Sequence, residues 1–137
     1  MSEQIHVQIV TSGGVVFDDR CSYTELPLEG GSIGVLGNHV PILGAMTDGV
    51  VKCRTAEGEI FIATGQGVAN VSNNEVILLV RNAELAKDID VPRAQASEQR
   101  ARERLADKNG HWDMLRAEAS LHRALARQAA VRMSSGK

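Results

Sequence analysis

The stretch Ile89-Asp90-Val91-Pro92-Arg93-Ala94 divides this 137-residue chain into two parts with different sequence patterns. Before it, short alternating apolar runs are separated by glycines, a pattern typical of strands and turns. After it, Ala, Glu, Gln, Leu and Arg dominate and one break occurs around Gly110, which predicts two helices. The stretch itself places an acid and a base on either side of a helix start. We therefore expect a β + α fold, with a β body followed by a helical pair.

The part before this stretch predicts eight to ten short strands. Residues 5–10 alternate between apolar and polar side chains, and comparable runs recur up to residue 80. Gly or Asn stands at most of the intervening turns, including Asn73-Asn74, and eleven of the thirteen glycines precede residue 81. Short strands at close spacing favour a sandwich or a barrel. We expect an N-terminal β-sandwich domain over residues 1–84.

The part after it predicts an antiparallel two-helix hairpin over residues 85–137, which we call the helical arm. Asp90 is a good N-cap, and Pro92 falls in the first turn, where its missing N–H is tolerated. The first helix should end near Ala106, Gly110 should take a left-handed exit conformation, and the second helix should cover about residues 112–132. The apolar stripes of both helices are thin and alanine-rich. Since burial stabilises by about 25 cal/mol per Å², such stripes should hold the arm loosely enough to leave the sandwich.

Composition and charge restrict the core and the partners. Hydrophobic residues make up 43% of the chain but aromatic residues only 3%, so the core must consist of Val, Ile, Leu and Ala. Residues 1–80 carry three bases against nine acids, a net of −6, whereas residues 81–137 have a net charge of +4. This asymmetry indicates that the arm meets something anionic: nucleic acid, an acidic protein surface or a nucleotide phosphate.

Several function classes are disfavoured. Cys21 and Cys53 lack the spacing of a zinc site or disulfide scaffold, which favours small buried residues in a reducing compartment. There is no phosphate-binding P-loop, and no serine or cysteine has a convincing base, so we expect no catalytic residues and no enzyme. The N-terminus does not resemble a signal peptide, and no run of about 18 apolar residues could span a membrane. Four histidines show no metal-ligand spacing, so we expect no metal: His6, His39, His111 and His122.

Arginines in the arm suggest one chemical site. Arg123 and Arg127 share a face of the second helix, and Arg93 and Arg100 share a face of the first. If the helices are antiparallel, these guanidiniums converge near Asp90 and could bind a nucleotide, since arginine forks match phosphate oxygens. The alternative is a solvated basic face with ordinary pairs such as Glu98–Arg102. The residues alone leave both interpretations open.

A longer stretch is similar to a known family. Gly31-Ser32-Ile33-Gly34-Val35-Leu36-Gly37-Asn38-His39-Val40-Pro41-Ile42-Leu43 resembles the Gly-x-hydrophobic-Gly-x-x-x-x-His-x-Pro stretch of the epsilon subunit of bacterial F-type ATP synthases. Gly65-Gln66-Gly67-Val68-Ala69 looks like the glycines that begin a later strand of that family, and His-Arg-Ala-Leu-Ala-Arg at 122–127 resembles its last helix. The similarity covers almost the whole chain.

The resemblance implies a rotor subunit of the central stalk, with no catalytic role and no required cofactor. The sandwich would pack on the gamma subunit and the c-subunit ring, and the complex would hold the chain on the cytoplasmic side of the cell membrane as a peripheral protein. The arm would either fold on the sandwich or extend into the alpha/beta subunits and block ATP hydrolysis, while the rotor couples proton translocation to ATP synthesis. No nucleic acid is expected as a partner.

The resemblance also implies a regulatory ligand. Some members bind ATP in the folded form through an Ile/Leu-Asp-x-x-Arg-Ala signature, which residues 89–94 match in full. The ATP-binding residues expected from it form one set: Glu84, Ile89, Asp90, Arg93, Arg100, Arg123 and Arg127.

The chain departs from the family pattern at a few positions. Gly37-Asn38-His39 replaces the usual Pro-Gly-His, Ser32 stands where many members carry an acid, and Pro92 lies within the signature. Ser32 and His39 are the candidates for contact with the c-ring or gamma. The alternative to the rotor subunit is a free-standing β-sandwich binding module whose helical arm serves dimerisation or nucleic-acid binding.

Overall fold

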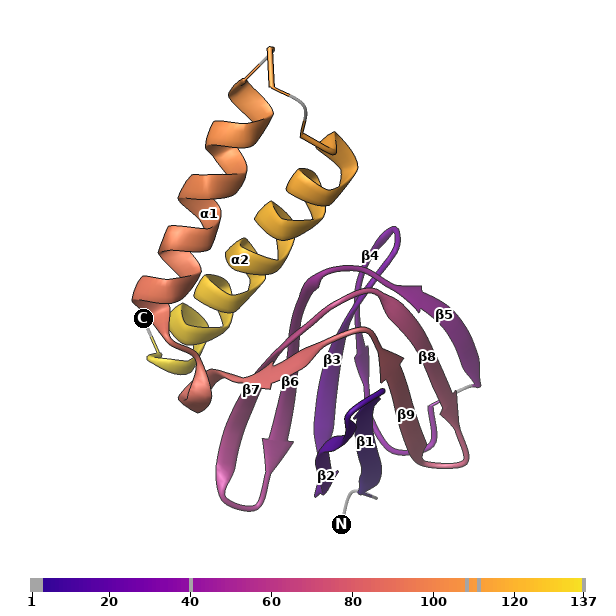
Figure 1. Cartoon of the computed structure of the whole chain (residues 1–137). Helices are drawn as coiled ribbons and strands as arrows, with labels where there is room; N and C mark the ends of the chain where they lie inside the picture. Colours follow the sequence, from indigo (N-terminus) through magenta and orange to yellow (C-terminus); the bar gives the residue numbers. More distant parts are fainter. Residues whose placement is uncertain (1–3, 40, 108, 111, 137) are drawn as a thin grey trace.

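A computed structural model of the chain describes residues 4–39, 41–107, 109–110 and 112–136. Figure 1 shows a β-sandwich with a helical hairpin leaning on one side of it. The predicted order of a sandwich followed by a hairpin is therefore confirmed.

The sandwich contains ten strands. Their bounds are β1 (Ile5–Thr11), β2 (Gly14–Cys21), β3 (Tyr23–Leu28), β4 (Gly31–Val35), β5 (Ile42–Met46), β6 (Gly49–Thr55), β7 (Gly58–Thr64), β8 (Gly67–Ser72), β9 (Glu75–Val80) and β10 (Ala83–Leu85). They form one continuous sheet in the order β10-β7-β6-β3-β5-β8-β9-β1-β2, and β4 pairs with β3. The β1–β9 pair is parallel and the others are antiparallel. Because β2 packs against β6 and β10, the sheet curls back on itself and is nearly closed.

Asparagine turns help to set the register. Asn73 and Asn74 have φ values of 53° and 61°, so both occupy the left-handed region between β8 and β9. Two such residues match the twist of an antiparallel hairpin, and Ser72 pairs directly with Glu75 across the turn. The turn predicted at Asn73-Asn74 is confirmed.

The core is aliphatic, as the composition predicts. Its largest fully buried side chains include Ile5, Ile9, Leu26, Ile62 and Leu78. Among the described residues, Phe17 supplies the aromatic ring that packs against this core, and it is half-buried. Alternate residues of β1 and β9 point into this core, as expected when one face of a sheet is covered.

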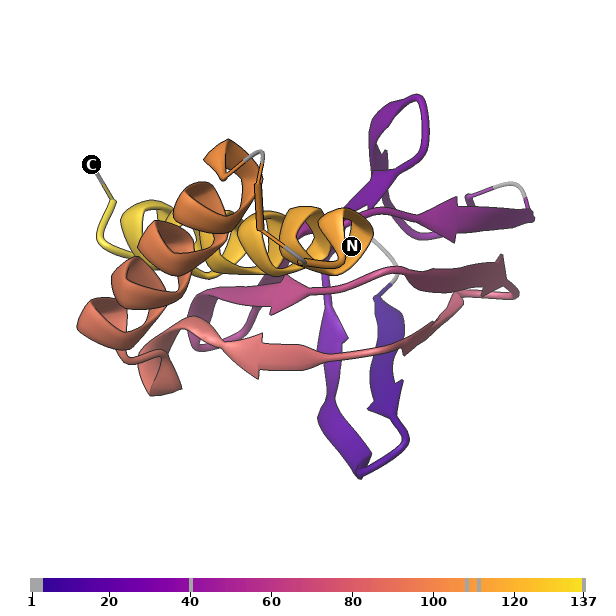
Figure 2. The same cartoon turned by 45° about the horizontal axis from the view of Figure 1, so that its top comes forward.

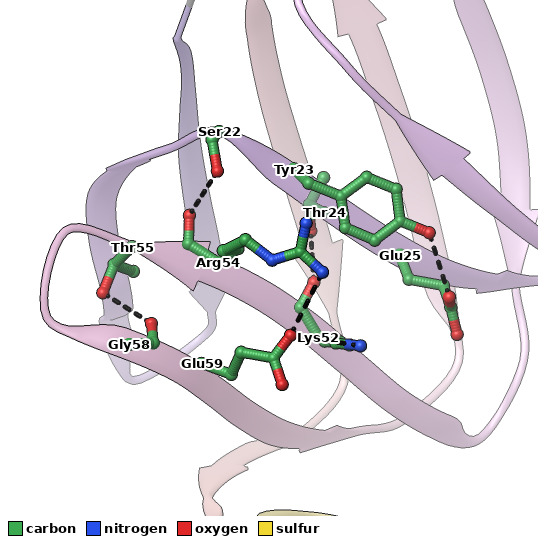
Figure 3. Close-up of polar contacts among 9 residues, drawn as sticks. All are labelled: Ser22, Tyr23, Thr24, Glu25, Lys52, Arg54, Thr55, Gly58 and Glu59. Atoms are coloured by element: carbon green, nitrogen blue, oxygen red, sulfur yellow. Dashed lines mark hydrogen bonds and ion pairs between the residues drawn. The ribbon is translucent and has the colours of Figure 1, made fainter.

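Cross-strand polar contacts fix the pairing of β3, β6 and β7 on the outer surface (Figure 3). Glu59 forms ion pairs with Lys52, at 3.2 Å, and with Arg54, at 3.3 Å. The guanidinium of Arg54 lies 5.2 Å from the centre of the Tyr23 ring, and the Tyr23 hydroxyl donates to Glu25 at 3.0 Å. Arg54 is directly opposed to Tyr23 on β3 and to Glu59 on β7, so these two contacts stabilise one register, while Lys52 reaches Glu59 diagonally.

The helical arm contains α1 (Val91–Ala106) and α2 (Met114–Ser134), preceded by the short 3-10 helix η1 (Ala86–Asp88). The Asp90 side chain accepts a hydrogen bond from the Arg93 backbone N–H, which confirms the predicted N-cap, and Pro92 lies in the first turn. The prediction for Gly110 is wrong, because its φ is not in the left-handed region. Two side chains pack closely over this glycine, since a Cβ there would lie 2.6 Å from the Asp107 carboxylate and from the Trp112 ring.

Alanines hold the arm together and on the sandwich. In both views α1 and α2 lie side by side, with the end of α2 beside the start of α1 (Figures 1 and 2). Helix α2 packs on β6, β7 and η1. A small apolar cluster joins them, in which fully buried Ala130 meets Phe61, Ala63 and Ala86. Every buried residue of the two helices is an alanine, so the predicted thin stripes are confirmed.

Candidate functional site

A cavity of about 290 Å³ lies between α1 and α2. Its lining contains five arginines, two serines and two buried alanines: Arg93, Ser97, Arg100, Ala101, Arg104, Ser120, Arg123, Ala124 and Arg127. We call this cavity the arginine groove. The alanines form its floor, since Ala101 and Ala124 are each 1% exposed and let the two helices approach closely. The groove therefore exists only while the hairpin is folded.

Helical spacing explains why these side chains share the groove. On α1, Ser97, Arg100 and Arg104 follow Arg93 by 4, 7 and 11 residues, which keeps them on one face. On α2, Arg123 and Arg127 follow Ser120 by 3 and 7 residues. The antiparallel hairpin turns these two faces toward each other.

The arginines of the groove are poorly compensated. Arg127 donates to Glu84 at 3.0 Å, whereas Arg100 and Arg123 each donate only to a serine hydroxyl one turn earlier, at 3.2 and 3.1 Å. Within the described part of the chain, no carboxylate pairs with Arg93, Arg100 or Arg123, and no acid lines the groove. Guanidiniums gathered without counter-charge repel one another, so this arrangement favours an anion with several oxygens.

The structure brings together four of the seven residues expected at an ATP site. Arg93, Arg100, Arg123 and Arg127 all line the groove. Glu84 on β10 lies beside it through its ion pair with Arg127.

The other two expected residues have structural contacts outside the lining. Asp90 uses one carboxylate oxygen to cap α1. Ile89 packs half-buried against the cluster around Ala130 that docks the arm. Both therefore lie at the open end of the hairpin, next to Arg93.

Three lining residues were missed from sequence: Ser97, Arg104 and Ser120. Arg104 also stacks on the Trp112 ring, with its guanidinium carbon 4.7 Å from the ring centre. The signal for Ser97 and Arg104 was available, because both continue the helical spacing from Arg93. Ser120 precedes Arg123 by three residues and could have been found in the same way.

Part of α1 fits the alternative interpretation, a solvated face with ordinary ion pairs. Arg102 pairs with Glu98 at 2.8 Å on that helix, and Gln128 of α2 donates to the same carboxylate at 2.8 Å. The hydrogen bonds from Gln128 and Arg102 hold the pKa of Glu98 below its ordinary value. The paired side chains and the unpaired arginines therefore lie on different faces of one hairpin.

The two candidates for c-ring or gamma contact lie apart. Ser32 is exposed near the start of β4, whereas His39 follows the end of that strand. His39 lines a surface cavity of about 390 Å³ together with Asn38, Pro41 and Asn73. The Asn38 N–H donates to the Asn74 side chain at 2.6 Å, which ties this loop to the β8–β9 turn.

The described residues offer neither a cluster of metal ligands nor an exposed cysteine thiol. No group of three or more His, Cys, Asp or Glu side chains in that part of the chain could hold a metal ion, and His111 lies outside it. Cys21 and Cys53 are free thiols and fully buried, as predicted. Neither described helix is long and apolar enough to cross a membrane.

Fold and site together define a class of protein, a β-sandwich that carries a docked helical hairpin with an arginine-lined groove. The beta-sandwich domain model of the ATP synthase delta/epsilon chain matches residues 4–86, and the long alpha-helix domain model of the same chain matches residues 87–132. Identity to the ATP synthase epsilon chain of Gloeobacter violaceus is 40%, over 90% of this chain and 93% of that one. The Staphylococcus aureus epsilon chain is 34% identical over 88% of this chain and 90% of its own. The chain belongs to the ATP synthase epsilon-chain family.

Solved structures share the fold at lower identity. A chain of the Euglena gracilis mitochondrial ATP synthase F1/c-ring assembly superposes with a TM-score of 0.81 at 17% identity, over 93% of this chain and 81% of that chain. A chain of the Tetrahymena thermophila ATP synthase central stalk and c-ring superposes with a TM-score of 0.53 at 16% identity, over 98% and 96%. The fold of this chain is thus also found in these two structures at low sequence identity.

Proposed function

We propose that this chain is a non-catalytic rotor subunit of an F-type ATP synthase that helps to couple proton translocation to ATP synthesis. Its sandwich packs on the gamma subunit and the c-subunit ring, and the complex holds it peripherally on the cytoplasmic side of the membrane. Membership of the epsilon-chain family supports this role, and the solved assemblies with the same fold contain an F1 part, a central stalk or a c-ring.

In this proposal the helical arm restrains ATP hydrolysis when it leaves the sandwich and extends toward the alpha and beta subunits. The net charge of +4 in residues 81–137 and the alanine-only packing of the helices support a mobile, basic arm. Reconstituted enzyme lacking residues 89–137 should therefore hydrolyse ATP faster than the intact enzyme. Equal rates would rule out the inhibitory role while leaving the rotor role in place.

ATP is the proposed ligand of the arginine groove. The observation that carries this proposal is the set of guanidiniums without carboxylate partners, gathered from both helices. A triphosphate matches them in charge and in acceptor oxygens. Glu84 and Asp90 at the open end supply carboxylate oxygens that can accept from adenine or ribose donors, and Ile89 supplies an apolar surface.

Binding in the groove favours the folded arm, because the groove has both helices as its walls. A ligand shifts such an equilibrium only by its differential affinity for the two states, and an extended arm offers only half of the contacts. ATP therefore acts as a regulatory ligand that withdraws the arm from the catalytic subunits.

Calorimetry on the full chain tests this binding. Arg100→Ala plus Arg123→Ala removes one guanidinium from each helix and leaves the Glu84–Arg127 pair intact. Two charge-assisted contacts should account for a loss of about 100-fold or more in affinity for ATP. Arg102→Ala is the matched control, since Arg102 pairs with Glu98 outside the groove. Unchanged affinity in the double variant would remove ATP from the proposal.

A further inference from the structure

A second cavity, of about 550 Å³, lies between the sandwich and α2. The connection from β9 to β10 contributes Arg81 and Asn82 to its lining. The first half of α2 contributes the remaining side chains: Leu115, Arg116, Ala119, Ser120 and Arg123. One wall therefore belongs to the sandwich and the other to the helical arm. We call it the bridging cavity.

The bridging cavity carries positive charge without compensation. Arg81, Arg116 and Arg123 all line it, and no acid does. None of the ion pairs within the described residues involves these three arginines. Three cations around one cavity raise the local potential and attract a multivalent anion.

The sandwich wall of this cavity is well anchored. The Arg81 N–H donates to the Gln66 carbonyl at 2.9 Å, and the Gly65 N–H donates to the Asn82 carbonyl at 2.8 Å. A Cβ at Gly65 would lie only 2.2 Å from the Asn82 side-chain oxygen, so this side chain packs directly on the glycine backbone. This backbone holds the Cα of Arg81 in place beside α2, so the exposed side chain starts from a fixed point on the cavity wall.

We propose that the bridging cavity is a second anion site, which binds a small molecule bearing phosphate groups. A carboxylate offers one charge and two oxygens, whereas a phosphate group offers up to two charges and three acceptor oxygens. Three guanidiniums match the phosphate better, and the Ser120 hydroxyl adds a further donor. Arg81 and Arg116 are absent from the lining of the arginine groove, and Arg93 and Arg100 are absent from that of the bridging cavity. The two sites share only Arg123 and Ser120.

A phosphate in the bridging cavity joins the arm to the sandwich. Since its contacts come from both, it binds the docked arm better than the extended arm and opposes undocking. This consequence for the enzyme rests on the proposed function of the arm, whereas the binding itself does not. The bridging cavity is thus a place where cellular phosphate compounds act on the arm without entering the arginine groove.

The test uses calorimetry of the full chain with inorganic pyrophosphate at physiological ionic strength, which screens weak surface attraction. In the variant Arg93→Ala plus Arg100→Ala the arginine groove is impaired, and we expect one pyrophosphate site to remain. Adding Arg81→Ala should weaken that site about tenfold, as expected for the loss of one charge-assisted contact. Adding Arg20→Ala instead is the matched control, since Arg20 is an exposed arginine of the sandwich on β2, outside the cavity.

Three results would overturn the proposal. The first is that the Arg93/Arg100 variant binds no pyrophosphate. The second is that Arg20→Ala weakens binding as much as Arg81→Ala does, which would indicate general charge attraction. The third is that a glutamate-rich peptide binds more tightly than pyrophosphate in an Arg81-dependent way, which would assign the cavity to an acidic protein segment. Arg93 and Arg100 do not line the bridging cavity, so loss of ATP binding in the Arg93/Arg100 variant leaves this outcome unaffected and the two proposals fail separately.

Discussion

Arg127 of α2 donates from Nε to the Glu84 carboxylate of β10 at 3.0 Å, across 43 residues of sequence. Within the described residues this is the only ion pair that joins the helical arm to the sandwich. The same Arg127 lines the arginine groove. One guanidinium therefore takes part both in docking the arm and in the candidate anion site, so the two properties are physically linked.

Glu84→Gln should loosen the docked arm. The pair is partly exposed, with side-chain exposures of 23% for Arg127 and 36% for Glu84, so its contribution is at most about 1 kcal/mol. We expect up to about a fivefold loss of hydrogen-exchange protection in α2, while the core strands stay unchanged. Equal protection of α2 in both proteins would contradict a docking role for this pair.

Ala130→Leu should displace the arm by overpacking its contact with the sandwich. Ala130 is fully buried against Phe61, Ala63 and Ala86, and extra methylenes in such a site cost about 1–3 kcal/mol. In the reconstituted enzyme we expect slower ATP hydrolysis, because the proposed inhibitory state is the extended one. Hydrolysis assays and hydrogen exchange of α2 measure the two effects.

The matched control for this substitution is Ala96→Leu on the exposed face of α1. It adds the same side chain without entering the docking contact, so protection and hydrolysis should stay at the wild-type level. If Ala130→Leu left α2 fully protected, the cluster around Ala130 would not be what holds the arm.

Gly67→Ala should destabilise the sandwich. A Cβ at Gly67 would lie 2.0 Å from the Leu79 carbonyl oxygen of the paired strand, so the backbones of β8 and β9 must move apart. We expect a loss of about 3 kcal/mol in the free energy of unfolding, measured by urea denaturation. Gly13→Ala is the control, because a Cβ there has its nearest contact at an ordinary 3.6 Å. If Gly67→Ala lowered the free energy of unfolding no more than Gly13→Ala does, the close contact between Gly67 and β9 would not matter for stability.

The stability of the sandwich should depend on pH through His6. Its ring lies between two carboxylates, 2.5 Å from Asp18 and 3.0 Å from Glu75. The hydrogen bond to Asp18 raises the pKa of His6 above its ordinary 6.5, and the same bond lowers the pKa of Asp18 below 3.8.

The sign follows from these two shifts. A raised histidine pKa stabilises the fold fully below pH 6.5, and this contribution is lost as pH rises through the folded value. The Asp18 contribution is present above pH 3.8 and is lost as pH falls through its folded pKa. Thermal unfolding should therefore separate wild type from His6→Asn most strongly between pH 3.8 and 6.5. A Tm difference that stayed constant from acidic to alkaline pH would exclude this pair as the cause.

Local chemistry explains which predictions succeeded. Asp90 caps α1 through a bond to a backbone N–H only three residues away, so the start of the helix could be predicted from sequence. The Asn73-Asn74 turn depends on the tolerance of asparagine for positive φ, which is also a local property. The prediction of a left-handed conformation at Gly110 failed, and no local rule gives the positions of the Trp112 ring and the Asp107 side chain that pack over this glycine.

The arginine groove was predictable only in part. Helical spacing showed that Arg93 and Arg100 share a face, and that Arg123 and Arg127 share another. The same spacing extends to Arg104, which the prediction left out, but only the structure shows that the cap bond of Asp90 takes up one of its carboxylate oxygens. The bridging cavity was not predictable, because Arg81 meets Arg116 and Arg123 only through the way α2 packs on the sandwich.

The stretch Ile89–Ala94 by itself determined where strands give way to helices, since capping and periodicity act within one helical turn. Charge composition likewise determined that the arm is basic and the sandwich acidic. Tertiary structure decided which arginines lack carboxylates, that Arg127 reaches Glu84, and that two cavities lie on either side of α2. These features depend on the angle and register at which the alanine-rich helix faces pack. Because the buried alanines are all the same size, the sequence alone does not select one angle or register.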